Sequence, residues 1–442
     1  MLKQHQIFFD FLRFCIGSAK EIPDSLKEAD WKELYAIAKK QCLVGILFDG
    51  IKKLPAEHVG MKKELLLQWM AESQMLEKAN VRLNDAAIQV SEWFRKKGFR
   101  TCILKGQGNA LMYPNPYSRT PGDIDIWVEG GDKRVISFVR SISPHEKACY
   151  HHIDFPSYKG VEVEVHYRPS FLLCFRHNRK LQKYYERVKE EQFSHRVMLG
   201  VQGEIAIPVV EFNLIFQLTH IYAHLMNEGI GLRQLLDYYY VLCDFYKVND
   251  ISKITPSLFT LKEGSTFSPS PSSSGSGDVT ALRCSEPLRY KDGGASKPSP
   301  DCAGWDRLEM RGEMAAECAG ASATDACSSS AIDRVQMELK KLGLWKFAGA
   351  IMYIMQEVFG MSASRLIVPP NEKYGKFVLN EVLEAGNFGK HDERNRFGKS
   401  KLGHNLQRMY RDMRLVRYFP AEALSEPIFR VWHFFWRLKH RR

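Results

Sequence analysis

The stretch Arg119–Val128, which reads RTPGDIDIWV, constrains the fold of this chain more than any other part of the sequence. Alternation of aspartate with isoleucine predicts a β-strand with Ile124 and Ile126 turned toward a core. Asp123 and Asp125 then share the opposite face, where two close carboxylates repel each other unless a cation lies between them. Mg²⁺ or Mn²⁺ suits that position, because both are hard cations that take carboxylate oxygens.

A second strand-like stretch, VEVEVHYRP from 161 to 169, offers a third acid. Its valines face one way, while Glu162, Glu164 and His166 face the other. If this strand neighbours the aspartate strand, Glu164 reaches the same ion, and the cluster can hold the attacking and leaving oxygens of a phosphoryl group. The simpler alternative is a half-exposed strand, which also alternates valine with glutamate.

A glycine turn precedes the aspartate strand in ILKGQGNALMYPNPYSR. The expected strand ends at Leu104, Gly106 permits a tight turn, and the residues that follow begin like a helix. Backbone N–H groups at Gly106 and Gln107 can bind phosphate oxygens at such a turn. Lys105 and Arg119 can neutralise the remaining phosphate charge, and the alternative is that both are ordinary surface charges.

The hydrophobic pattern predicts an α+β fold. Residues 5–97 are helical by periodicity, and short strands are expected at 101–104, 123–128, 150–155 and 161–167, with a helix near 131–140. Helical periodicity resumes near 210. We therefore expect a small mixed β-sheet core between N-terminal helices and a C-terminal helical domain.

Five segments follow from this pattern: an N-terminal helical segment (1–80), the core (81–200), the first part of a helical domain (201–253), an insertion (254–331) and the second part of the helical domain (332–442). Serine, glycine, proline and alanine dominate the insertion, and its hydrophobic periodicity disappears. We interpret it as a disordered or artefactual segment and assign it no function.

The net charge of +12 and the pI of about 9.1 favour contact with an anionic molecule. Part of the excess lies in residues 404–442, which are rich in arginine and aromatic residues. This pattern predicts two amphipathic helices with a solvated basic face, with a polyanion site as the alternative. Ten cysteines without a CxxC pair indicate thiols, and the sequence shows neither a signal peptide nor a membrane span, so we expect a cytoplasmic protein.

These motifs together resemble a known family. The order of strand, glycine turn, helix, DxD strand and later acidic strand is similar to the nucleotidyltransferase superfamily of DNA polymerase β. More narrowly, LKG, YPNP, GDIDIWV, EVHYR, the stretch HIYAHLMNEGIGLRQLLDYYYVL and EAGNFGKHDER resemble a bacterial family of uncharacterised nucleotidyltransferases, over the whole chain except 254–331.

The resemblance implies transfer of a nucleotide from an NTP, with ATP among the candidates, to an acceptor with release of pyrophosphate. Asp123, Asp125 and Glu164 would be catalytic ligands of Mg²⁺ or Mn²⁺, with Glu164 as ligand or as base. Lys105, Gly106, Gln107 and Arg119 would bind the nucleotide. The chain departs from the superfamily at Gln107, where a serine hydroxyl usually contacts phosphate. The acceptor, whether a sugar, a metabolite, a protein side chain or an RNA end, is left open.

Other polar pairs have simpler interpretations. His220 and His224 share one helix face and are expected to be core or interhelix hydrogen-bonding residues. Arg233 and Asp237 have the spacing of an intrahelical salt bridge, with a place for Arg233 at the active-site cleft as the alternative. His151 and His152 are discounted as metal ligands with Asp154, because strand alternation puts them on opposite faces. The GNFG motif at 386–389 predicts a helix-ending turn.

Two other functions compete with catalysis. A catalytically degenerate protein of the same fold would bind nucleotide or a partner without turnover. A nucleic-acid-binding protein would depend on the basic charge and bind RNA or DNA with steep salt dependence, although no reader motif supports it.

Overall fold

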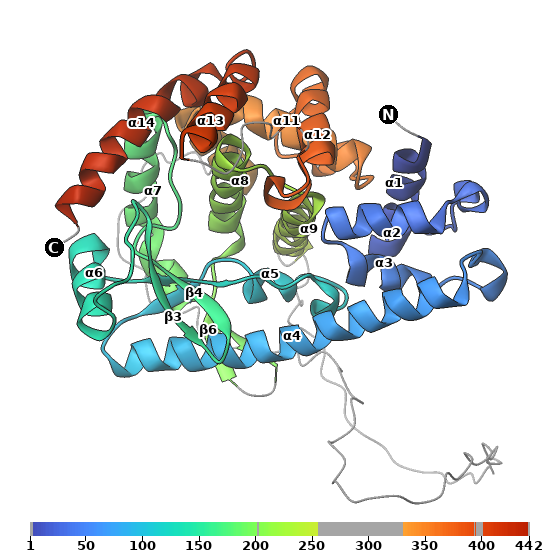
Figure 1. Cartoon of the computed structure of the whole chain (residues 1–442), viewed down its shortest axis with the longest axis horizontal. Coiled ribbons are helices and arrows are strands. Elements are labelled where there is room, and N and C mark those ends of the chain that lie inside the picture. Colours follow the sequence, from blue (N-terminus) through green and yellow to red (C-terminus); the bar gives the residue numbers. More distant parts are fainter. Residues whose placement is uncertain (1–2, 201–202, 255–329, 393, 395–400, 441–442) are drawn as a thin grey trace, which may run out of the picture. The chain divides into compact units, whose positions relative to one another are not determined.

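The structure is a computed structural model and describes residues 3–200, 203–254, 330–392, 394 and 401–440 (Figure 1). The described residues form one compact unit. The predicted insertion at 254–331 falls almost wholly on 255–329, which lie outside the described residues.

The α-helices occupy both ends of the chain and surround the strands (Figure 1). They are α1 (Lys3–Ile16), α2 (Trp31–Lys40), α3 (Val44–Ile51), α4 (Lys63–Lys96), α5 (Gln107–Ala110), α6 (Gly131–Ile142), α7 (Phe175–Ser194), α8 (Val210–Asn227), α9 (Leu232–Ile254), α10 (Ala331–Lys341), α11 (Trp345–Glu357), α12 (Glu372–Ala385), α13 (Lys401–Leu415) and α14 (Pro420–Lys439). Short 3-10 helices lie at Asp24–Glu28, Ala56–His58, Pro116–Ser118, Ala363–Arg365 and Asn387–Gly389.

Local signals set the ends of several helices. Asp30 begins α2 because its side chain accepts hydrogen bonds from the N–H groups of Lys32 and Glu33. The long helix α4 ends beside Gly98, whose positive φ of 79° lets the chain turn into the first strand.

Four strands form a mixed sheet in the order β1-β2-β4-β3. They are β1 (Thr101–Ile103), β2 (Ile124–Val128), β3 (His152–Tyr158) and β4 (Val161–His166). β1 and β3 run antiparallel to their neighbours, whereas β2 and β4 are parallel. The expected α+β architecture and the four predicted strands are confirmed, and no strand end differs from the predicted one by more than three residues.

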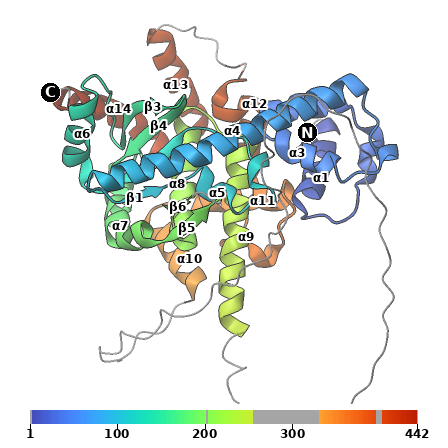
Figure 2. The ribbon, with the colours of Figure 1, turned by 90° about the horizontal axis from the view of Figure 1, so that it is seen from below.

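The two faces of this sheet differ in chemistry. One face carries Ile124, Ile126, Val163 and Val165, which are buried with apolar residues of α4 and α6 in a single core cluster. In Figure 2, α4 runs across the strands on this side. Side chains of the opposite parity point to the other face, where acids and histidines lie beside the buried residues Cys102 and Trp127.

Three elements were not predicted from the sequence. The helix α7 follows the sheet, and β5 (Arg196–Leu199) and β6 (Gly203–Ala206) pair as a separate antiparallel hairpin. These strands are four residues long, which is too short to give a clear alternation of apolar and polar residues.

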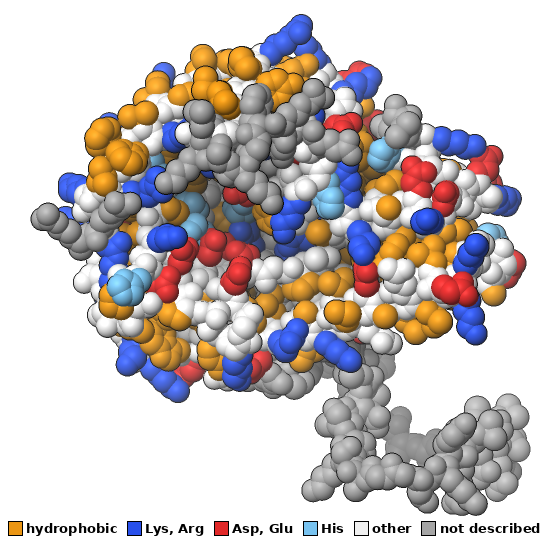
Figure 3. All heavy atoms as spheres, in the orientation of Figure 1, with side chains coloured by type: hydrophobic (Ala, Val, Ile, Leu, Met, Phe, Trp, Pro, Cys, Tyr) orange, Lys and Arg blue, Asp and Glu red, His pale blue; other side chains and the backbone are white. Residues whose placement is uncertain are grey.

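The two predicted C-terminal amphipathic helices are confirmed as α13 and α14, but their orientation differs from the prediction. Hydrophobic side chains cover much of the outer surface of α14 (Figure 3): Leu424, Ile428, Val431, Phe435 and Leu438 are all exposed, and the exposed basic residues Arg437 and Lys439 lie in its last turn. Arg408 of α13 and Arg430 of α14 instead line an internal cavity. Among the described residues, no helix is both long and apolar enough to cross a membrane.

Candidate active site

The polar face of the sheet brings together the three predicted acids. Asp125 on β2 is the register partner of Glu164 on the parallel strand β4, and Asp123 directly precedes β2. One carboxylate oxygen from each of the three lies within 4.8 Å of the others. Asp125 is buried, while Asp123 and Glu164 are partly exposed. The pairing of β2 with β4 therefore brings together the three acids that the two separate motifs predicted.

Asp125 is held by two cationic side chains. Its Oδ1 atom lies 2.9 Å from Lys105 Nζ and 3.0 Å from His166 Nε2. Burial opposes ionisation of Asp125, but the charge of Lys105 and the hydrogen bond and charge of His166 outweigh it and lower its pKa well below the usual value. Asp125 is therefore a carboxylate whose charge Lys105 and His166 offset.

Asp123 has the opposite environment. The charge of Asp125, followed by burial, raises the pKa of Asp123 above its usual value. For Glu164, burial is outweighed by a hydrogen bond from His166 and the charge of His152, so its pKa is lowered. A cation bound in the cluster would therefore favour the ionised form of Asp123.

Histidines lie along the same face of the sheet. His152 Nδ1 is 3.3 Å from Glu164 Oε2, and His166 Nε2 is 3.4 Å from the same oxygen. Burial opposes protonation of His152, but hydrogen bonds to Asp154 and Cys149 and the charge of Glu164 raise its pKa to about 11. Hydrogen bonds to Asp125 and Glu164 likewise raise the pKa of His166 against the effect of burial.

The prediction that His151 and His152 point to opposite faces of the sheet is wrong. β3 begins only at His152, so strand alternation does not apply to His151. The His151 Nε2 atom lies 3.1 Å from His152 Nδ1, and both residues line the same cavity.

His220 on α8 also faces this cavity, where its Nε2 atom lies 2.9 Å from Lys105 Nζ. An ammonium group only donates hydrogen bonds, so His220 Nε2 accepts. Burial and the charge of Lys105 lower the pKa of His220. His220 is thus a hydrogen-bonding histidine, as predicted, but its partner is the lysine of the glycine turn and not a residue of another helix.

The glycine turn takes the expected position. Gly106 has φ 54° and ψ −109°, a conformation that favours glycine, and it lines the cavity between β1 and α5. The side chain of Gln107 is different, because it is buried and donates a hydrogen bond to Asn84 on α4. A phosphate contact from the Gln107 side chain is not supported by this geometry.

Arg119 is also placed differently from the prediction. Its Nε and Nη2 atoms each lie 2.8 Å from an oxygen of Asp237 on α9, and both residues are buried. Tyr113 donates a further hydrogen bond of 2.7 Å to Asp237. The guanidinium of Arg119 therefore binds a carboxylate 118 positions away, a pairing that no local motif reveals, instead of facing phosphate.

The same pairing replaces the predicted salt bridge between Arg233 and Asp237. Arg233 donates instead to the carbonyl of Thr120, at 3.3 Å, and it lines the cavity. Arg233 therefore lies at the cleft, which was the alternative to the predicted salt bridge.

The acids and histidines line a cavity of about 740 Å³, which lies within the usual volume range of small-molecule sites. Acidic, basic and histidine side chains gather at its opening (Figure 3). Helices α8, α9, α13 and α14 contribute to its wall, as do Phe388 of the predicted GNFG turn, which ends α12, and Lys390, which follows that turn. The lysine and arginine side chains of this wall are Lys105, Arg119, Arg233, Lys390, Arg408 and Arg430.

An α+β protein with a carboxylate cluster on the wall of a charged cavity is the class that this fold and site define. A family model described as "Uncharacterised nucleotidyltransferase" matches residues 27–258, slightly more than half of the chain. The chain belongs to this family, and the membership supports a general nucleotidyl transfer activity. No curated protein and no solved structure matches the chain significantly.

Proposed function

We propose that this chain is a divalent-metal-dependent nucleotidyltransferase that moves a nucleoside monophosphate from an NTP to an acceptor hydroxyl or phosphate. The observation that carries the proposal is the convergence of Asp123, Asp125 and Glu164 within 4.8 Å at the wall of a large cavity. Family membership supports the reaction class.

The donor set fits Mg²⁺ or Mn²⁺. Three carboxylates from two strands are the hard ligands that these ions take, and both ions leave coordination positions for phosphate oxygens. The raised pKa of Asp123, caused first by Asp125, is independent support, because a cation between the two would relieve their repulsion. When bound, the ion would neutralise the charge that develops on the phosphate during transfer.

The chain's own residues would bind and orient the triphosphate. The Lys105 side chain is 19% exposed and offsets Asp125, so a cation bound at Asp125 would free its ammonium group for a phosphate oxygen. Lys390 and Arg408 also line the cavity and offer further positive charge. Arg119 would act indirectly, since its pairing with Asp237 fixes the segment that leads into β2.

In the reaction, an acceptor oxygen attacks the α-phosphorus, the bond to the β-phosphate oxygen breaks, and pyrophosphate leaves with the electron pair. The acceptor proton passes to a base. The lowered pKa of Glu164 favours a role as metal ligand over a role as that base. Positioning and charge neutralisation then account for most of the catalysis.

A catalytically degenerate nucleotide-binding protein is the second candidate. Gln107 favours it, because its buried side chain does not replace the serine hydroxyl that usually contacts phosphate in similar enzymes. Such a protein would bind NTP in the same cavity without releasing pyrophosphate.

The test is pyrophosphate release from each of the four NTPs with Mg²⁺ or Mn²⁺, with candidate acceptors added and the products identified by mass spectrometry. Asp123→Asn, Asp125→Asn and Glu164→Gln should each lower the rate by more than about 100-fold, a larger loss than an outer-shell residue causes. Glu162→Gln, an exposed acid on the same strand, is the matched control and should keep the rate. Stabilisation by an NTP without pyrophosphate release from the parent chain would favour the degenerate protein.

A further inference from the structure

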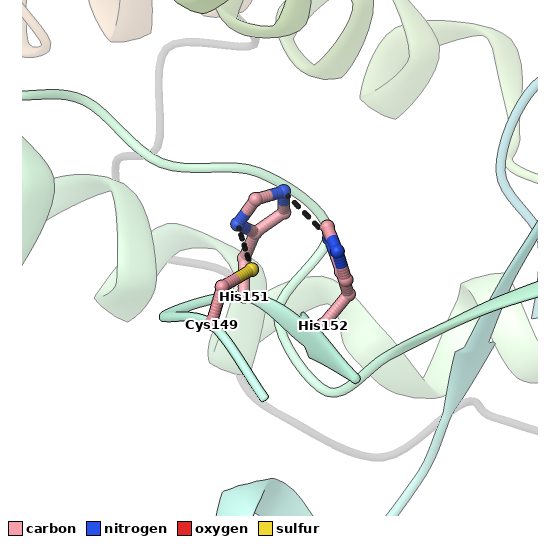
Figure 4. Close-up of side chains that lie close together, drawn as sticks. All are labelled: Cys149, His151 and His152. Carbon is pink, nitrogen blue, oxygen red and sulfur yellow. Dashed lines mark hydrogen bonds between the residues drawn. The ribbon is translucent and has the colours of Figure 1, made fainter. Parts of the chain in front are cut away.

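A second group of metal-binding side chains lies beside the carboxylates. Cys149, His151 and His152 belong to the segment that enters β3, and one donor atom of each lies within 4.8 Å of the other two. The His151 ring lies between the Cys149 sulfur and the His152 ring (Figure 4), with its Nδ1 atom 3.5 Å from Sγ and its Nε2 atom 3.1 Å from His152 Nδ1.

The chemistry of this group differs from that of the carboxylates. Thiolate and imidazole are borderline or soft ligands that select Zn²⁺ and related transition metals over Mg²⁺. In a tetrahedral zinc site with Zn–S near 2.3 Å and Zn–N near 2.0–2.1 Å, sulfur and nitrogen lie about 3.5 Å apart. The distance of 3.5 Å between Cys149 Sγ and His151 Nδ1 agrees with that value. The distances between the other pairs of donor atoms are at most 4.8 Å and would shorten when an ion binds.

Hydrogen bonds hold the backbone of this segment in place. The carbonyl of His151 accepts from the N–H groups of Tyr167 and Arg168 at 3.0 and 3.1 Å. The Tyr167 hydroxyl donates to the carbonyl of Cys149, and Arg168 donates to the carbonyl of Tyr150 at 2.7 Å. The donor atoms are therefore carried by a fixed backbone, as metal-ligating side chains require.

Outer-shell partners are also present. His152 Nε2 lies 3.7 Å from Asp154, which leaves Nδ1, 3.1 Å from His151 Nε2, as the nitrogen that would bind the ion in its deprotonated form. Carboxylates beside a ligating histidine orient the ring and increase its basicity. Cys149, His151 and His152 all line the cavity, so a fourth coordination position would face the same space as the acids.

We propose that Cys149, His151 and His152 form a site for a Zn²⁺-class ion, with an open fourth position that faces the cavity. This site is separate from the one assigned to Asp123, Asp125 and Glu164, and it does not depend on nucleotidyl transfer. Three protein ligands with one open position match zinc sites that bind a water molecule or a substrate oxygen.

The test uses the full chain, stripped with a chelator and titrated with Co²⁺, which replaces Zn²⁺ and is visible by absorption. We expect a thiolate-to-cobalt charge-transfer band at one ion per chain, removed by added Zn²⁺ but not by Mg²⁺. Cys149→Ser should abolish the band. Asp123→Asn should keep it, which separates this site from the carboxylates, and so should Cys243→Ser, a partly buried cysteine of α9.

X-ray absorption of the zinc-loaded parent chain gives a second measurement that does not depend on a variant folding. It should show one sulfur and two imidazole nitrogens around zinc. A shell of oxygen and nitrogen alone, or a cobalt band that survives Cys149→Ser, would overturn the proposal. Loss of the band in Cys174→Ser but not in Cys149→Ser would also overturn it, because Cys174, His177 and Glu422 form another close group.

Discussion

Replacing Asp123 by asparagine should stabilise the metal-free protein and abolish its stabilisation by metal. The three carboxylates lie within 4.8 Å of one another. Two unit charges at that distance repel by about 3.5 kcal/mol at an effective dielectric constant of about 20. Lys105 and His166, 2.9 and 3.0 Å from Asp125, cancel part of this repulsion. We therefore expect Asp123→Asn to raise the free energy of unfolding by about 1–2 kcal/mol.

The assay is thermal unfolding in a chelating buffer and again with saturating Mg²⁺ and NTP. For a folded chain of this size the gain corresponds to about 1–3 °C. The pKa of Asp123 is raised in the folded state, so the folded protein binds this proton more tightly than the unfolded one does. The benefit of asparagine should therefore be present above that pKa and disappear as the pH falls through it.

With Mg²⁺ and NTP present, the order of stability should reverse, because only the parent chain binds the ion and is stabilised by it. Glu162→Gln, an exposed acid on β4 two residues from Glu164, should change neither measurement. Destabilisation of the metal-free Asp123→Asn protein, or an unchanged response to Mg²⁺, would refute the electrostatic account of the cluster.

Four further predictions follow from individual contacts. Asp237→Asn leaves the buried guanidinium of Arg119 without its anion and should cost about 3–5 kcal/mol in a urea unfolding experiment, whereas Asp244→Asn on the same helix should cost little, since burial raises the pKa of Asp244. Lys105→Met should weaken NTP binding by about 10–100-fold in calorimetry, as expected for one charged hydrogen bond, and an equal loss in Lys133→Met, an exposed lysine of α6, would contradict the assignment. Mg²⁺ affinity should fall as the pH is lowered toward the raised pKa of Asp123, above the usual range of an aspartate, because protons compete with the ion for this carboxylate; a constant affinity would exclude Asp123 as a ligand. Gly106→Ala should cost about 1–3 kcal/mol, because φ is 54° there; Gly60→Ala, at a glycine without positive φ where an added Cβ would lie 3.6 Å from its nearest neighbour, serves as the comparison for backbone strain in thermal unfolding.

Short-range patterns in the sequence predicted the sheet and its acid cluster because both depend on strand alternation. Asp123, Asp125 and Glu164 are identified by their parity within two strands, and parallel pairing of those strands brings them together. The fold class was predictable for the same reason, since the switch from helical to strand periodicity near residue 100 marks the core.

The remaining features depend on contacts that are distant in the sequence. Asp237 on α9 pairs with Arg119, and His220 on α8 bonds Lys105; neither pairing has a local signature. β3 begins at His152, so His151 lies outside the strand and its side chain is not forced to the opposite face from that of His152. The close spacing of Cys149, His151 and His152 in the sequence is a signal for this cluster. It was discounted because the predicted strand at 150–155 would put the two histidines on opposite faces.

A crystal of the full chain soaked with Mn²⁺ and a non-hydrolysable NTP analogue tests the central claim most directly, because Mn²⁺ is located by its anomalous scattering. The account predicts an anomalous peak bonded to oxygens of Asp123, Asp125 and Glu164, with the analogue's phosphates beside Lys105. Bound analogue with no peak at these carboxylates, or a peak at some other group, would contradict it.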